Sequence, residues 1–213
     1  MDNRRCKMEN EIERLKKMNE YENINHAKGY KYICGIDEAG RGPLCGPVVA
    51  SAVILPKDIC IEGVNDSKKL TEKKREILFA EIMEKAVAVG VGMVWQEEID
   101  EINILEATKK AMKMATEALE VKADYALIDG NQKVPLQIPY ETVVKGDALS
   151  QSIAAASIIA KVTRDKMLVD LDKKYPEYGF AKHKGYGTKA HIEAIKEHGL
   201  CEIHRKTFCK KFI

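Results

Sequence analysis

The 213-residue chain lacks long hydrophobic runs, Cys-x-x-Cys pairs, internal repeats and low-complexity linkers. Its longest strongly apolar segments, 48–55 and 153–160, are far shorter than the roughly 18 residues that a membrane span requires. No apolar stretch follows the N-terminal residues 1–5, so we expect no secretory signal. Without secretion, the six scattered cysteines do not favour a disulfide framework. We therefore expect a cytoplasmic protein with no membrane partner; a monomer is a separate expectation that these features do not establish.

Charge is nearly balanced overall but uneven along the chain. The formal net charge is +2, whereas residues 145–213 alone carry 14 Lys/Arg against 8 Asp/Glu, a net +6. Four of the five histidines also lie in this last third. A basic segment facing an acidic cluster suits a nucleic acid, because lysines bind the backbone phosphates. The alternative interpretation is a solvated, lysine-rich helical face.

Acidic residues stand at the ends of three apolar segments that are typical of strands. These acids are Asp37 with its neighbour Glu38, then Asp129, and Asp147. Ligands of open α/β sheets bind outside the carboxyl ends of the strands, where these side chains would gather. Carboxylates that are close together repel one another and resist desolvation, and hard divalent cations prefer oxygen ligands. The pattern favours a metal site, although solvated strand ends are the simpler local interpretation.

A glycine-rich turn with an arginine follows the first pair of acids directly. Gly40, Arg41 and Gly42 offer backbone that can approach a ligand closely and a guanidinium suited to phosphate. Acids for a metal beside such a turn indicate phosphodiester chemistry.

The hydrophobic pattern predicts one α/β domain. We expect strands over 31–37, 48–55, 87–94, 123–129 and 138–144, and helices over 8–28, 71–85, 97–119, 150–174 and 189–197. Short links suit an antiparallel meander for the first three strands, and helical crossovers suit parallel pairing afterwards. Asp37 and Asp129 would then end neighbouring strands that point the same way. We expect residues 1–29 to form a helical arm and residues 30–213 to form the catalytic domain, with a helical extension from about 175.

Six stretches of the chain form a specific combination of motifs. They are residues 35–47 (GIDEAGRGPLCGP), 65–70 (NDSKKL), 127–130 (LIDG), 145–147 (KGD), 154–165 and 183–188 (HKGYGT). From about residue 8 to residue 212, the chain resembles ribonuclease HII, the type 2 ribonuclease H family. The resemblance implies an α/β ribonuclease H-like fold, with a mixed central sheet flanked by helices, an N-terminal helical arm and a helical C-terminal extension.

The resemblance also implies an endoribonuclease that acts in ribonucleotide excision repair. Such an enzyme hydrolyses the RNA strand of RNA/DNA hybrids and incises 5′ of single ribonucleotides embedded in duplex DNA. Water activated by a divalent metal leaves 3′-hydroxyl and 5′-phosphate ends. The alternatives are another metal-dependent nuclease of this fold, acting on branched or DNA substrates, and a non-catalytic hybrid-binding protein.

Residue roles follow from the same resemblance. Asp37, Glu38, Asp129 and Asp147 correspond to the four acids that hold one or two Mg²⁺ or Mn²⁺ ions. Gly40, Arg41 and Gly42 match the turn that senses the ribose 2′-hydroxyl, and Tyr186 matches an aromatic ring that packs on the following deoxyribose. Lys68 and Lys184 are candidates to bind phosphate, with ordinary surface lysines as the alternative.

Two other groups of residues invite a competing assignment. Asp165 lies near Asp147 in the sequence, but an ion pair with Lys161 one helical turn away explains it. His198, Cys201, His204 and Cys209 have short spacing, yet they lack the paired cysteines of a zinc knuckle. We therefore expect no structural zinc.

Overall fold

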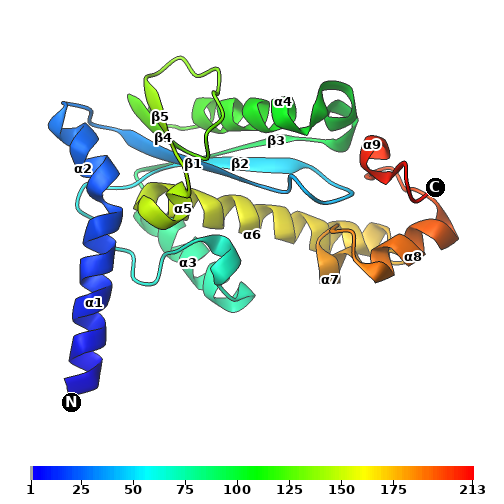
Figure 1. Cartoon of the computed structure of the whole chain (residues 1–213), viewed down its shortest axis with the longest axis horizontal. Coiled ribbons are helices and arrows are strands. Elements are labelled where there is room, and N and C mark those ends of the chain that lie inside the picture. The colour runs from blue at the N-terminus through cyan, green and yellow to red at the C-terminus, as the bar shows by residue number, and fades with distance from the viewer. Residues whose placement is uncertain (1) are drawn as a thin grey trace.

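The computed structural model describes the backbone of residues 2–213 and the side chains of residues 9–213. A five-stranded mixed sheet forms its centre, in the order β3-β2-β1-β4-β5 (Figure 1). The strands are β1 (Ile33–Ala39), β2 (Val48–Ile54), β3 (Ala88–Val94), β4 (Tyr125–Asp129) and β5 (Tyr140–Val143). The first three strands pair antiparallel, and β4 adds to β1, and β5 to β4, in parallel. The predicted meander and parallel additions are confirmed.

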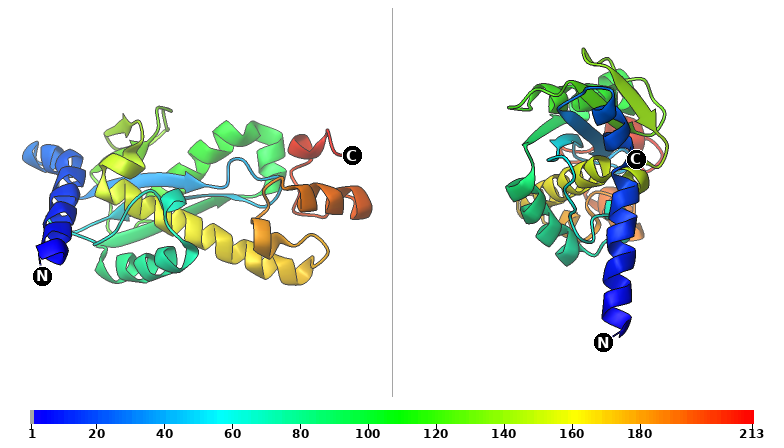
Figure 2. Two further views of the ribbon diagram at one scale, coloured as in Figure 1. Left: turned by 60° about the horizontal axis from the view of Figure 1, so that its bottom comes forward. Right: turned by 90° about the vertical axis from the view of Figure 1, so that its left-hand side faces the viewer.

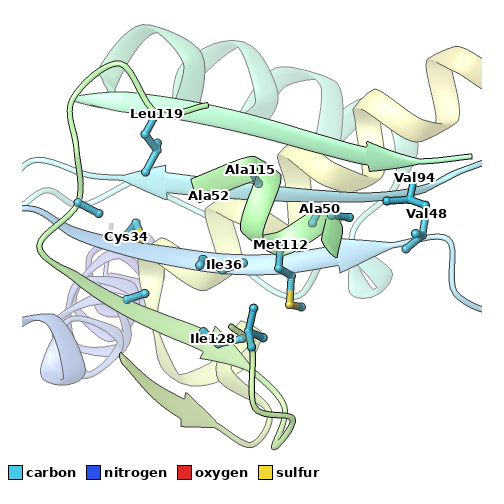
Figure 3. Close-up of a cluster of buried hydrophobic side chains, with 14 of the residues drawn as sticks. Cys34, Ile36, Val48, Ala50, Ala52, Val94, Met112, Ala115, Leu119 and Ile128 are labelled. Carbon is cyan, nitrogen blue, oxygen red and sulfur yellow. The ribbon is translucent and has the colours of Figure 1, made fainter. Parts of the chain in front are cut away.

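Two long helices cover the two faces of this sheet (Figure 1). Helix α4 (Gln96–Glu117) packs on β3 and β2, and α6 (Gln151–Lys174) packs on β1 and β2. Small residues allow both approaches, because a Cβ at Gly35 would overlap the backbone of Ser152 at the start of α6. On the α4 side, Ala115 belongs to the same buried cluster as sheet residues such as Ile36 (Figure 3), and so does Ala111. The start of α6 is therefore held directly over β1.

The remaining helices lie at the edges and ends of this core. They are α1 (Asp2–Met18), α2 (Glu20–Ala27), the 3-10 turn η1 (Ser67–Lys69), α3 (Glu72–Lys85), α5 (Gly146–Leu149), α7 (Phe180–His183), α8 (Lys189–His198) and α9 (Lys206–Cys209). The N-terminal helices project at one end of the sheet, and α7, α8 and α9 gather at the other (Figure 2). No helix in the described chain is long and apolar enough to cross a membrane.

The N-terminal arm differs from the single helix predicted over 8–28. The chain forms two helices, α1 and α2, which meet at Asn19. The side-chain amide of Asn19 donates to the Ile59 carbonyl at 3.0 Å and accepts from the Gln151 side chain at 2.7 Å. These contacts fix a bend that a local pattern does not contain. The predicted helix 97–119 is likewise kinked at Asn103, where φ is +68°, and the Asn103 side chain accepts the amide of Leu105.

The C-terminal helices enclose a small core of their own. Tyr178, Phe180, Ile195 and Ile203 pack there together with Leu44 from the turn after β1. The chain around residue 44 is thus built into the C-terminal cluster rather than left as an isolated loop. Residues far apart in the sequence therefore meet beside the end of β1.

Candidate active site

The predicted acids lie where two parallel strands end. Ile36 of β1 is opposite Ile128 of β4, so Asp37 and Asp129 follow at matching positions of neighbouring strands. Asp129 in turn pairs with Val143 of β5, just before the segment that forms α5 and carries Asp147. The Gly146 amide donates to Asp129 Oδ1 at 2.7 Å, which ties the start of α5 to the end of β4. The topology thus brings Asp37, Asp129 and Asp147 to one edge of the sheet.

Asp37 is the most deeply buried of these carboxylates, with 4% of its surface exposed. Its Oδ1 accepts the Glu38 amide at 2.7 Å. Burial raises the pKa of Asp37 well above its usual value, and the charges of Glu38 and Asp129 raise it further. The nearby Ser157 hydroxyl of α6 opposes this rise. An ionised Asp37 therefore needs positive charge nearby.

Glu38 faces the other side of β1, as alternation along a strand requires. It lines a cleft of 230 Å³ with Arg41, Asp129 and residues of α4 such as Thr108. Burial raises the pKa of Glu38 and Asp129 adds to the rise, while Arg41, whose Nη1 lies 3.4 Å from Glu38 Oε1, opposes it. Asp129 is therefore a common neighbour whose charge raises the pKa of both Asp37 and Glu38.

Asp147 has an acidic neighbour that sequence reasoning missed. Its carboxyl group lies near that of Asp66, and burial, then Asp66 and Asp129, raise the pKa of Asp147. Asp66 also accepts the Lys68 amide at 2.9 Å at the start of η1. The only sequence signal was the position of Asp66 inside the 65–70 motif, where it resembled an ordinary turn residue. Asp66 is thus a fifth carboxyl group at this site.

Lys68 is placed among the acids. Burial lowers the pKa of its ammonium, but Asp37, Asp66, Asp147 and Asp129 outweigh this effect and raise it. The side chain itself remains exposed, so its charge faces both the carboxylates and solvent. Lys68 is therefore positioned to meet an anion that approaches the acids.

Lys184 is directed elsewhere. Its ammonium donates to the Ala181 carbonyl and lies 3.9 Å from Glu72, and its backbone has a left-handed φ of +51°. No contact between its ammonium and the carboxylate cluster occurs in the described residues. Asp165 forms the expected ion pair with Lys161, at 2.7 Å, which accounts for its acid without a catalytic role.

The turn after β1 and the Tyr186 loop lie side by side. The Leu44 amide donates to the Gly185 carbonyl at 2.8 Å, and a Cβ at Gly42 would meet Tyr186 Cε1 at 3.9 Å. Arg41 and Gly42 are exposed, Gly40 is buried, and Tyr186 is 44% exposed. The two motifs predicted to contact the sugar therefore form one surface beside the acids.

The donor set suits a hard divalent cation. The four predicted ligands are all carboxylates, and their mutual repulsion together with the burial of Asp37 is what such a cation relieves. Among the described residues, no group of three or more His, Cys, Asp or Glu side chains has the geometry of a metal-binding site. The chemistry therefore fits Mg²⁺ or Mn²⁺, and the acids would hold it at the ends of β1 and β4 and in α5.

Of the four residues considered for zinc, Cys201 and His204 lie in contact, with 3.1 Å between Sγ and Nδ1, whereas His198 and Cys209 have other partners. His204 bonds to His191, with 3.1 Å between their Nε2 atoms, and accepts the Cys201 amide at 3.0 Å. Cys209 is buried against the Leu44 carbonyl, and His198 lies beside Glu197. His204 thus serves a buried hydrogen-bond chain that ends on the Tyr186 carbonyl through His191.

Comparison with known proteins gives a consistent result. The family model described as Ribonuclease HII matches residues 34–211. A protein named Ribonuclease HII from Acetivibrio thermocellus is 59% identical over 212 residues, covering 100% of this chain and 83% of that protein. The crystal structure of ribonuclease H2 from Pyrococcus horikoshii OT3 has a TM-score of 0.70 and 30% identity, covering 85% of this chain and 97% of the other. The structure of a PCNA:RNase HII complex from Archaeoglobus fulgidus has a TM-score of 0.68 and 29% identity, covering 82% and 94% of the two chains.

Proposed function

The chain belongs to the ribonuclease HII family, and we propose that the carboxylates of β1, β4 and α5 carry out its phosphodiester hydrolysis. It is a metal-dependent ribonuclease that cleaves the RNA strand of RNA/DNA hybrids and incises at ribonucleotides in DNA. A nuclease for branched or DNA-only substrates is not favoured, because the family match covers most of the chain. The finer assignments rest on one observation: acids from two parallel strand ends and α5 lie beside a turn suited to approach a sugar.

Asp37, Glu38, Asp129 and Asp147 are the proposed metal ligands, for one or two Mg²⁺ or Mn²⁺ ions. When bound, such ions acidify water and steady the oxygen that leaves phosphorus. The protein's own contribution is to fix the acids: the Gly146 amide holds Asp129, and the Glu38 amide holds Asp37. Lys68 supplies positive charge for the phosphate on the solvent side. We propose cleavage 5′ of the ribonucleotide, with 3′-hydroxyl and 5′-phosphate products.

Selection of RNA over DNA must rest on the 2′-hydroxyl, since this group distinguishes the two sugars at a given site. We assign its recognition to the backbone of Gly40, Arg41 and Gly42, whose exposed part adjoins the Tyr186 ring. Tyr186 would then pack on the deoxyribose that follows the ribonucleotide. The role of Lys184 in phosphate binding stays a prediction, which its contact with Ala181 does not support.

The cellular location and the oligomeric state are proposals as well. Five cysteines among the described side chains are free thiols, which agrees with a reducing, cytoplasmic location. We propose a monomer in which residues 30–213 form the catalytic domain, with the C-terminal extension from about 175 packed on Leu44.

Duplex DNA containing one ribonucleotide, compared with an all-DNA duplex of the same sequence, tests this function. With Mg²⁺ or Mn²⁺, we expect a single cut 5′ of the ribonucleotide and none in the control. Cleavage of both duplexes, or of neither, would contradict the proposal. Branched DNA in the same assay tests the alternative substrate class.

A further inference from the structure

Arg205 is a fully buried guanidinium whose partners are all backbone carbonyls of the turn after β1. Its Nε donates to Gly46 at 3.0 Å, its Nη1 to Arg41 at 3.0 Å and Pro43 at 2.9 Å, and its Nη2 to Gly40 at 2.6 Å and Gly46 at 2.9 Å. No carboxylate pairs with it among the described residues. Burial lowers the pKa of Arg205 to about 9, so it stays charged at neutral pH. Burying this charge is unfavourable, and every hydrogen bond that its side chain donates goes to that one turn, while the Phe208 ring lies 5.1 Å from its guanidinium carbon.

The hydrogen bonds of Arg205 determine which way the amides of the turn point. In a trans peptide the C=O and the following N–H point in opposite directions. Because the Gly40 and Arg41 carbonyls face Arg205, the amides of Arg41 and Gly42 face away from it. The Pro43 carbonyl shows the same rule, since the next amide, that of Leu44, reaches outward to Gly185 at 2.8 Å.

The two amides that face outward belong to exposed residues, Arg41 and Gly42, beside the Tyr186 ring. Neither donates a hydrogen bond to the rest of the chain in its described part. They are therefore two fixed donors at the surface where the sugar of the substrate is expected. A site whose donors bind a substrate hydroxyl discriminates against the sugar that lacks this hydroxyl, because binding that sugar leaves the donors unpaired. An apolar surface at the same place would discriminate less.

We propose that Arg205 is a positioning residue for sugar specificity: it aims the Arg41 and Gly42 amides at the ribose 2′-hydroxyl. The inference rests on the proposed function and adds a residue that lies outside every motif used to reach it. A lysine at position 205 retains the charge but has only three donors on a single nitrogen. It cannot hold the Gly40, Arg41, Pro43 and Gly46 carbonyls together, so the turn loses its fixed orientation.

The test measures binding to two duplexes that differ by one oxygen atom, with a chelator present so that neither is cut. One duplex carries a single ribonucleotide, and the other carries the deoxynucleotide. Two additional hydrogen bonds should give the wild type about a tenfold to hundredfold preference for the ribonucleotide duplex. Arg205→Lys should reduce this preference to about threefold or less, while its affinity for the all-DNA duplex stays within about threefold of wild type.

Ile195→Val is the matched control, because Ile195 is equally buried in the C-terminal core and its side chain has no hydrogen-bonding group. It should keep the wild-type preference. The inference is overturned if Arg205→Lys keeps the preference, or if it weakens binding to both duplexes equally. Failure of the wild type to cleave the ribonucleotide duplex when Mg²⁺ is added would instead refute the proposed function.

A second measurement uses only the wild type and does not depend on whether Arg205→Lys folds. Hydrogen exchange resolved at single amides should be fast at Arg41 and Gly42 in the free protein. The ribonucleotide duplex should slow exchange at both amides by at least about tenfold, and the all-DNA duplex should not. Protection in the free protein, or equal protection by the two duplexes, would overturn the inference.

Discussion

Two glycines of the same turn should respond to alanine in opposite ways. Gly40 is buried against Arg164, whereas Gly42 is exposed and faces the Tyr186 ring. We expect Gly40→Ala to damage the fold, and Gly42→Ala to leave the fold intact while damaging activity. The pair separates the support of the turn from its contact with substrate.

The cost at Gly40 has two sources. Its φ of +96° strains any residue with a Cβ, by about 1–2 kcal/mol. The added carbon would also overlap the Arg164 side chain and lie 2.8 Å from the Pro47 carbonyl. Arg164 would have to leave its hydrogen bonds to Pro47, Cys45 and Lys184, which adds roughly 2–3 kcal/mol. A total of about 3–5 kcal/mol lowers the Tm by roughly 6–20 °C for a chain of this size.

At Gly42 the structure offers space. The nearest atom to an added Cβ is Tyr186 Cε1 at 3.9 Å, an ordinary van der Waals distance, and the Tm should change by less than about 2 °C. The methyl group would nevertheless occupy the gap between the turn and the ring, where the sugar is expected. A displacement of the substrate by about 1 Å should reduce cleavage at a single ribonucleotide roughly a hundredfold.

Thermal melting and initial cleavage rates, measured on both variants and the wild type, decide the matter. Wild-type cleavage by Gly42→Ala would show that the turn does not approach the sugar. A wild-type Tm for Gly40→Ala would show that Arg164 is not packed against the turn as described.

Four further outcomes are expected. Asp37→Asn should abolish cleavage and keep hybrid binding. It should also raise the Tm of the metal-free protein, because it removes a buried charge that Glu38 and Asp129 repel. Near wild-type turnover would refute the metal assignment. Chelation should stop activity with little change in circular dichroism, and stoichiometric zinc lost together with the fold would contradict this. Tyr186→Ala should reduce the cleavage rate at a single ribonucleotide by roughly one to two orders of magnitude, by analogy with stacking worth about 1–3 kcal/mol, and reduce it less on long hybrids. Tyr186→Phe should have a mild effect. Equal losses on both substrates would indicate general scaffolding. Burial lowers the pKa of His191 and His204 to about 4, below the unfolded value of about 6.5, so their stabilisation is complete above pH 6.5 and is lost as the pH falls towards 4. The gap in denaturation midpoint between wild type and His191→Gln should narrow over that range, and a constant gap would count against this reasoning.

The sheet could be predicted because its signals are local. Each strand is a short apolar run, and the acids that end β1 and β4 follow the hydrophobic pattern directly. The link lengths then favoured the antiparallel and parallel pairings that the structure shows. The sequence alone therefore predicts that Asp37 and Asp129 lie side by side.

The missed features depend on contacts between distant segments. The bend at Asn19 is fixed by Ile59 and Gln151, and the local sequence of the arm does not predict it. Asp66 reaches Asp147 only because the chain folds back over α6, where Ser67 and Ser157 bond at 2.7 Å. The burial of Arg205 was the hardest feature to predict from the sequence, since an arginine on a lysine-rich tail is expected at the surface. Its burial becomes comprehensible only when the carbonyls of a distant turn are seen around it.

The separation of Arg205 from Gly40, 165 positions along the chain, has a consequence for how the enzyme is made. A ribosome adds about 5–20 residues per second, so the turn is synthesised roughly 8–33 s before the residue that shapes it. All four acids, the last of them Asp147, are also made before Arg205. During synthesis the chain thus acquires the groups for cutting first, and the arginine that shapes the sugar-sensing turn among the last.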